Sequence, residues 1–179
     1  PLDDLETIKT EIILSDLDAI QKKLEKGKKK LLEEKEVKIL EDKLKQLNDG
    51  KEVVSNNKEE EKFLTTLGLL SIKPKIIVCN VDEESLAKGN SLTESVKKNY
   101  SEEKVVTICA DIEDQIMGLD KNERETFMRE IGLNKTGLNQ LIKEGYELLN
   151  LDTFFTSGPK ESRAWTVQKN TPAPKAASV

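Results

Sequence analysis

The chain has 179 residues, of which 35% are charged and only 4% aromatic, and its formal net charge is −5. This composition argues against an all-β domain and suits solvated helices, while the absence of His excludes Ser-His and Cys-His catalysis and most zinc sites. The acidic total gives no global reason to expect nucleic-acid binding, so any such site must be a local patch.

Two apolar stripes with helical spacing occupy the first fifty residues. They flank a lysine-rich turn at Gly27, and their members recur every three or four positions: Ile13, Leu17, Ile20 and Leu24, then Val37, Leu40, Leu44 and Leu47. Narrow stripes on otherwise charged helices predict an antiparallel hairpin in which the stripes face each other as in a coiled coil. The alternative is a pair of ordinary bundle helices in a compact core.

The pattern changes from helical to mixed at Lys75. A third helix is predicted from about Glu59 to Leu70, and Pro74 then breaks it. Continuous apolar runs at 76–79 and 105–109 flank a helix that Ser91 can cap, which predicts a βαβ unit with both strands buried on both faces. Further helices are expected at 111–117, 121–131 and 136–149, β-like segments at 151–155 and 164–167, and turns in the tail.

Both predicted strands end in residues suited to ligand contact. The first ends in Asn80-Val81-Asp82-Glu83 and the second in Cys109-Ala110. Ligands of open α/β sheets bind at the carboxyl ends of the strands. The first segment resembles the Asn-Lys-x-Asp guanine-binding motif of Ras-type GTPases, but it has Val for Lys and Glu for Asp. Taken alone, the tetrapeptide favours an ordinary strand-to-loop turn, because Asn-x-x-Glu is common in surface loops.

A longer resemblance covers essentially the whole chain. The segment from Leu148 to Thr166 closely resembles the passage from the G domain to the TGS domain, a small β-grasp module, in the YchF or Obg-like ATPase family. It contains the strings Leu-Asn-Leu, Thr-Phe-Phe-Thr and Arg-Ala-Trp-Thr of that passage. Leu5-Glu6-Thr7-Ile8 and the segment from Leu14 to Asp18 resemble the entry to the family's coiled-coil insertion, and Lys73-Pro74 also matches.

The resemblance implies an α/β fold class: the C-terminal half of a P-loop, Ras-like nucleotide-binding domain with an inserted antiparallel helical hairpin and the beginning of a TGS domain. The implied regions are 1–74 for the helical hairpin, 75–149 for the half G domain and 150–179 for the start of TGS. No Gly-x-x-x-x-Gly-Lys-Ser/Thr loop and no Asp-x-x-Gly switch occur in the sequence. These elements lie upstream in the family, so the chain is expected to be cut at both ends or only partly built.

By resemblance, the full-length protein is expected to be a ribosome-associated ATPase that acts as a regulatory switch, prefers ATP over GTP and uses ATP and Mg²⁺. GTP binding is the alternative specificity. The base contacts would fall on Asn80, Val81, Glu83, Cys109 and Ala110. No catalytic residue or metal ligand maps onto this chain, so it is expected to be inactive alone. The rival hypothesis is that the chain by itself is a non-enzymatic RNA or ribosome interaction module.

Lysines cluster at the expected hairpin tip: Lys22, Lys23, Lys26, Lys28, Lys29 and Lys30. They either contact RNA phosphates, together with the TGS domain, or form a solvated turn interleaved with glutamates. The thiols of Cys79 and Cys109 are expected to act as small buried apolar groups. Two isolated Cys residues and the lack of a membrane-spanning apolar run indicate a cytoplasmic protein with no membrane partner.

Overall fold

A computed structural model describes residues 1–27 and 32–178, which divide into two compact units, Pro1–Pro74 and Lys75–Val179. The first unit contains α1 (Leu2–Gly27), α2 (Glu34–Asn48) and α3 (Lys58–Thr66). The second contains β1 (Ile76–Asn80), α4 (Glu83–Lys88), α5 (Ser91–Asn99), β2 (Lys104–Ile108), α6 (Ala110–Gly118), α7 (Lys121–Glu130), α8 (Gly137–Leu148), β3 (Leu151–Ser157), β4 (Ser162–Gln168) and α9 (Ala173–Ala176). Among the residues described, no helix is long and apolar enough to cross a membrane.

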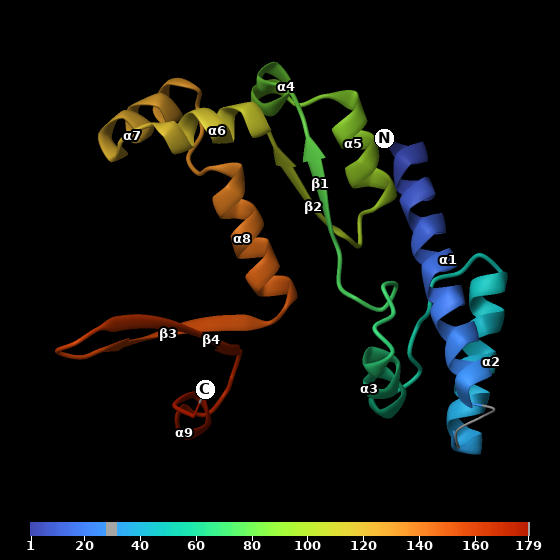
Figure 1. Cartoon of the computed structure of the whole chain (residues 1–179). Helices are drawn as coiled ribbons and strands as arrows, with labels where there is room; N and C mark the ends of the chain where they lie inside the picture. The colour runs from blue at the N-terminus through green and yellow to red at the C-terminus, as the bar shows by residue number, and fades with distance from the viewer. Residues whose placement is uncertain (28–31, 179) are drawn as a thin grey trace. The chain divides into compact units, whose positions relative to one another are not determined.

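Helices α1 and α2 lie side by side and run in opposite directions (Figure 1). Most members of the two predicted stripes share one apolar cluster, namely Ile13, Leu17, Ile20, Leu24, Leu40, Leu44 and Leu47. The cluster also includes Val53, Leu64 and Leu69, which come from α3 and the segments beside it. A pair of helices alone leaves much of each stripe exposed, and here a third element covers it. The hairpin is therefore present, but its core is that of a small three-helix unit.

Three charged side chains, Asp16, Lys43 and Glu60, are buried in this unit. Asp16, which is 1% exposed, accepts hydrogen bonds from the backbone N–H groups of Leu70 and Ser71 at 2.7 and 2.9 Å. Lys43, which is fully buried, forms an ion pair with Glu60 of α3 at 2.7 Å. An uncompensated buried charge is strongly destabilising, so each charge requires its partner. These contacts fix how α3 and the following turn close the hairpin.

Helix α3 ends at Thr66, earlier than the predicted end near Leu70. The reason is Gly68, whose φ of 72° lies in the left-handed region that terminates helices. Pro74, which was expected to break the helix, lies beyond the turn that follows.

Strands β1 and β2 pair in parallel, which confirms the predicted βαβ unit. Two helices lie between them in sequence, and α5 and α8 contact β2. The expectation that both strands are buried on both faces is wrong for β1, because Val78 is 42% exposed whereas Val106 of β2 is 1% exposed. In the described part of the chain this sheet has two strands, so β1 has a strand neighbour on one side only.

Two short helices, α4 and α9, were not predicted: no assignment was made from the sequence for the residues of α4 after Glu83, and turns were expected where α9 lies. The start of α5 also differs in detail. Asn90 caps this helix in place of Ser91, and its side-chain oxygen accepts a hydrogen bond from the Thr93 N–H at 2.8 Å. Helices as short as α4 and α9 contain too few apolar residues to show a helical period, so the sequence pattern does not reveal them.

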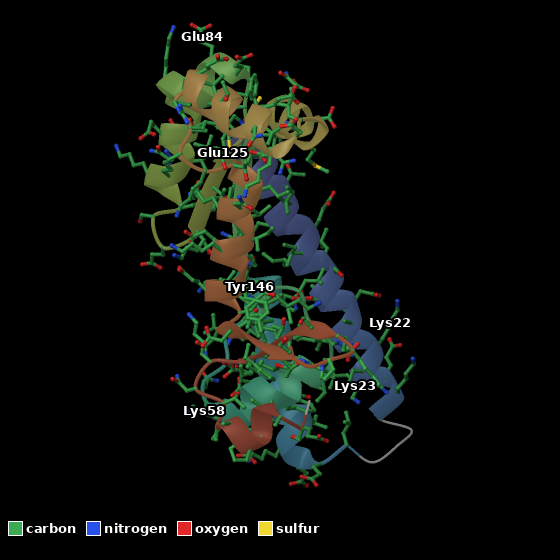
Figure 2. All side chains as sticks on the ribbon, turned by 90° about the vertical axis from the view of Figure 1, so that its left-hand side faces the viewer. Lys22, Lys23, Lys58, Glu84, Glu125 and Tyr146 are labelled. Carbon is green, nitrogen blue, oxygen red and sulfur yellow. The ribbon has the colours of Figure 1, made fainter. Side chains whose placement is uncertain are left out.

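Strands β3 and β4 form an antiparallel hairpin, which confirms the predicted β-like segments. The indole N–H of Trp165 donates to the Thr156 hydroxyl at 2.8 Å, and the Arg163 guanidinium lies 4.2 Å from the centre of the Trp165 ring. Tyr146 of α8 lies against the hairpin, with its hydroxyl 3.2 Å from that of Thr166 (Figure 2). The hairpin and α8 are thus joined by polar contacts.

Candidate functional site

The carboxyl ends of β1 and β2 bring four of the five candidate base-contact residues together. The parallel register places Asn80 opposite Ile108, so the loops starting at Val81 and Cys109 leave the same edge of the sheet. The side-chain Oδ1 of Asn80 accepts a hydrogen bond from the backbone N–H of Ala110 at 3.0 Å. The Val81 N–H donates to the Ile108 carbonyl at 2.8 Å. The two loops are therefore held to each other by two hydrogen bonds.

These bonds decide which polar groups the loops can offer to a base. The Val81 N–H is already used, whereas Asn80 is exposed and keeps a second lone pair on Oδ1 and two donors on Nδ2. The Asn80 amide can therefore both donate and accept further hydrogen bonds without breaking the bond to Ala110.

The two cysteines differ in burial. Cys109 is 1% exposed and is the N-cap residue of α6, directly after β2, so it supports the loop from inside and leaves Ala110 accessible. Cys79 is half-buried, and burial raises the pKa of its thiol, an effect that the positive charge of Lys97 partly offsets. The predicted role as a buried apolar group therefore holds for Cys109 and only in part for Cys79.

Glu83 is positioned differently from the other four candidates. It is the exposed first residue of α4, next to the N-cap residue Asp82. The Asp82 carboxylate accepts a 2.7 Å hydrogen bond from the Ser85 N–H, and this bond lowers the pKa of Asp82. A carboxylate in the first turn of a helix is favourable whatever its function. Asp82, which the sequence analysis did not select, thus caps α4 where this loop ends, and its Asp-x-x-Ser spacing is the signal that could have identified it.

The lysines of the predicted RNA-contact tip are described only in part. Outside the described residues lie Lys28, Lys29 and Lys30. Lys22, Lys23 and Lys26 occupy the last turns of α1, and Lys22 forms a 2.6 Å ion pair with Asp18 (Figure 2). For Lys23 and Lys26 no ion pair is recorded within residues 1–27 and 32–178. Among the residues that the structure describes, the ammonium groups of Lys23 and Lys26 thus have no recorded acidic partner.

Across the described residues, no three or more His, Cys, Asp or Glu side chains gather in a way that could hold a metal ion. The sequence also contains no Gly-x-x-x-x-Gly-Lys-Ser/Thr loop, whose hydroxyl residue binds Mg²⁺ in P-loop nucleotidases.

The sequence and fold match known proteins over the whole chain. It is 38% identical over 188 residues to the Ribosome-binding ATPase YchF of Haemophilus influenzae, a match that covers 100% of this chain and 52% of that protein. The Bacillus subtilis protein of the same name is 35% identical over 190 residues, with the same coverage. The solved structure of the Schizosaccharomyces pombe YchF GTPase matches with a TM-score of 0.84 at 25% identity, covering 100% of this chain and 52% of that one. Residues 151–179 match the family model YchF-GTPase_C, described as a protein of unknown function (DUF933).

The structure is thus an α/β fold of the kind seen in a YchF GTPase. Over its whole length the chain is similar to the C-terminal part of YchF proteins, which confirms the resemblance drawn from its sequence. It spans about half the length of the curated relatives it matches.

Proposed function

We propose that this chain is part of a ribosome-associated P-loop ATPase that acts as a regulatory switch, and that it supplies the base-recognition half of the nucleotide site. The observation that carries the proposal is the hydrogen bond from Ala110 to Asn80, which joins two loops at the edge where α/β sheets bind ligands. The similarity to relatives named as ribosome-binding ATPases supports the association with the ribosome and the use of ATP. Mg²⁺ and the phosphate-binding loop would come from outside these 179 residues.

Three regions have separate roles in this proposal. Residues 1–74 are the region of the coiled-coil hairpin, whose lysine-rich tip contacts RNA or the ribosome. Residues 75–149 are the C-terminal half of the nucleotide-binding domain, and 150–179 begin a TGS domain that also contacts RNA. The protein works in the cytoplasm.

The preference for ATP over GTP follows from Val81 and Glu83. A guanine site uses a carboxylate at a fixed distance to accept from N1–H and N2–H₂. Glu83 is one methylene longer than the usual Asp and stands at the start of α4, and Val81 carries no charge. A site built for one hydrogen-bond pattern leaves polar groups unpaired with the other base, which costs about 1–3 kcal/mol per buried group.

Calorimetry of the full-length protein with ATP and with GTP tests this specificity. The unmodified protein should bind ATP more tightly, and the double variant Val81→Lys/Glu83→Asp should shift the preference toward GTP. A control variant, Val54→Lys/Glu102→Asp, introduces the same side chains outside the two loops and should leave the preference unchanged. Tighter binding of GTP than ATP by the unmodified protein would contradict the proposal.

GTP binding is the second candidate, because the solved S. pombe relative is named as a GTPase and Asn80 of the guanine motif is retained. A third candidate is that the chain alone acts as a non-enzymatic interaction module. The purified 179-residue chain should show no ATP turnover, because transition-state stabilisation needs the P-loop Lys, Mg²⁺ and a positioned water. Turnover that disappears in an Asn80→Ala variant would contradict that expectation.

A further inference from the structure

A groove of about 540 Å³ in the second unit is lined by residues of α4, of α6 and of the end of α7 with the turn that follows it. Helices α4 and α6 follow the carboxyl ends of β1 and β2 (Figure 1). The apolar lining of the groove comes from Leu86, Ala87, Ile112, Ile131 and Leu133. Ile112 is 1% exposed and belongs to the buried cluster of this region, against which Leu86, Ile131 and Leu133 pack. The bottom of the groove is therefore formed by residues of the buried apolar cluster.

The backbone at the end of α7 places Leu133 in this lining. Gly132 has a φ of 74°, and its N–H donates to the Arg129 carbonyl at 3.2 Å. The Leu133 N–H donates to the Met128 carbonyl at 2.8 Å. These two bonds form a Schellman motif, which turns the residue after the glycine back onto the helix. The lining is thus built by a defined helix terminus.

The rim of the groove is acidic. Glu83, Glu84 and Glu130 line it, and no Lys or Arg is among the lining residues. The exposed side chain of Glu84, which is labelled in Figure 2, forms an ion pair with Lys88 at 2.9 Å. Among the described residues, no ion pair or hydrogen bond is recorded for the side chains of Glu83 and Glu130. Two carboxylates at an apolar groove are therefore available to an incoming cation.

The net charge of the whole chain resides in the segments that form this groove. Residues 82–88 and 110–135 contain ten acidic and five basic residues, whereas the rest of the chain contains 24 of each. Acidic residues thus outnumber basic ones in these segments and are balanced by them in the rest of the chain. An acidic rim repels nucleic acid and anionic lipid and attracts cationic partners.

We propose that this groove is a docking site for a basic, amphipathic segment of a partner protein, with its apolar side chains on Ile112, Ile131 and Leu133 and its Lys or Arg side chains over the glutamates. Recognition of an amphipathic segment by an apolar groove is a common mode of peptide binding, and complementary rim charges set its specificity. The groove belongs to the second unit, and of its lining residues only Glu83 is also a candidate base contact.

The test uses the 179-residue chain and three fluorescent 14-residue peptides. The first combines Lys with Leu at helical spacing, the second replaces Leu by Ser, and the third replaces Lys by Glu. Only the Lys/Leu peptide should bind in an anisotropy titration, and its affinity should fall with added salt. Methyl NMR should show the largest shifts at Ile112, Ile131 and Leu133, and small shifts at Ile142 and Leu149, which are 51% and 52% exposed on and just after α8.

Matched variants separate the groove from general electrostatics. Glu84→Gln/Glu130→Gln removes two rim charges and should weaken binding of the Lys/Leu peptide about fivefold to tenfold. Glu102→Gln/Glu161→Gln removes two exposed charges of the same unit outside the segments that form the groove, and it should leave the affinity unchanged. Glu83 is left intact because it is also a candidate base contact.

Three results would overturn the docking site. They are equal weakening by both double variants, equal binding of the Lys/Ser peptide, and methyl shifts centred on α8 in place of the groove. A protein that binds ATP normally but fails this test would retain the proposed nucleotide function, so the two proposals can fail separately.

Discussion

The side-chain Oδ1 of Asn80 accepts a hydrogen bond from the backbone N–H of Ala110, 3.0 Å away and thirty positions along the chain. The bond joins the end of β1 to the start of α6, next to the bond from Val81 N–H to the Ile108 carbonyl. Together they hold both strand-end loops before any ligand arrives. Asn80 thus has a structural role that must be separated from its proposed contact with a base.

The variant Asn80→Ala separates these roles. Asn80 and Ala110 are both exposed, so water can replace the lost bond, and the free energy of unfolding should fall by only about 0.5–1.5 kcal/mol. Nucleotide affinity of the full-length protein should fall by about tenfold or more, because both a hydrogen-bonding group and the loop geometry are lost. Urea denaturation and calorimetry measure the two effects. Asn99→Ala, which removes only a bond to Ser95 within α5, is the control, and unchanged affinity in Asn80→Ala would remove the residue from the site.

The buried ion pair between Lys43 and Glu60 should dominate the stability of the first unit. Lys43→Ala leaves a buried carboxylate without its cation and should cost about 3–5 kcal/mol, whereas Lys43→Met/Glu60→Leu should be close to neutral. Hydrogen exchange of amides in α2 and α3 measures this directly. The control is Lys35→Ala, because the ion pair of Lys35 with Glu59 joins the same two helices but is exposed, and such pairs contribute at most about 1 kcal/mol. Equal effects of Lys43→Ala and Lys35→Ala would contradict a special role of burial.

The same pair predicts a loss of stability in acid. Burial alone raises the pKa of Glu60, but hydrogen bonds from Lys43 and Asn56 and the charge of Lys43 bring it below the ordinary value of 4.5. The unfolded chain therefore takes up this proton first, so the stabilisation is present above pH 4.5 and is lost as pH falls through the lower folded pKa. Glu60→Gln should flatten the acid limb of a stability–pH curve measured by hydrogen exchange, while Glu59→Gln should not. If Glu60→Gln and Glu59→Gln have the same acid limb, the loss of stability in acid comes from other carboxyl groups.

Several features followed from local sequence patterns. The helical hairpin was predicted from residues three and four apart, and the parallel strands from two short apolar runs. The strand-end loop was found because Asn80 and Glu83 preserve the spacing of a known motif. Each signal lies within a few consecutive residues, and tertiary contacts did not need to be known.

Other features depend on contacts between distant segments. Asp16 and Lys43 are charged residues on solvated-looking helices, yet each lies three positions from a stripe residue, Ile13 and Leu40, on the face that α3 and its turn cover. A charge inside an apolar stripe was the available signal, but its partner could not be read from the sequence. The exposure of Val78 likewise depends on how many strands flank β1, which a strand's own residues do not specify.

Leu40→Asp should unfold the first unit and spare the second. Leu40 is fully buried in the cluster shared by α1, α2 and α3, so the variant places an unpaired charge there and should cost at least about 3 kcal/mol. The two units are separately compact, so amide resonances of β1 and β2 should keep their positions. Lys38→Asp, an exposed change on the same helix, is the control. Loss of the β1 and β2 resonances in Leu40→Asp would show that the two units fold as one.

The lysines of α1 should determine the salt dependence of ribosome or RNA binding. Each lysine that contacts a phosphate releases a counterion, so losing it reduces the slope of log affinity against log salt by about 1. Replacing Lys22, Lys23 and Lys26 by Glu in the full-length protein should therefore weaken co-sedimentation with ribosomes and flatten its slope by up to about 3. Lys22 should contribute least, because it is already paired with Asp18.

The control for this charge reversal replaces an equal number of exposed lysines elsewhere in the first unit, Lys45, Lys51 and Lys58. Both triple variants change the net charge equally, so only a local contact at the end of α1 makes them differ. Lys28, Lys29 and Lys30, outside the described residues, can be reversed as a third set, and they should behave like the α1 lysines. If all three sets sediment like the unmodified protein, with the same salt slope, the lysines form a solvated turn, and the ribosome contact must be sought in the β3–β4 region.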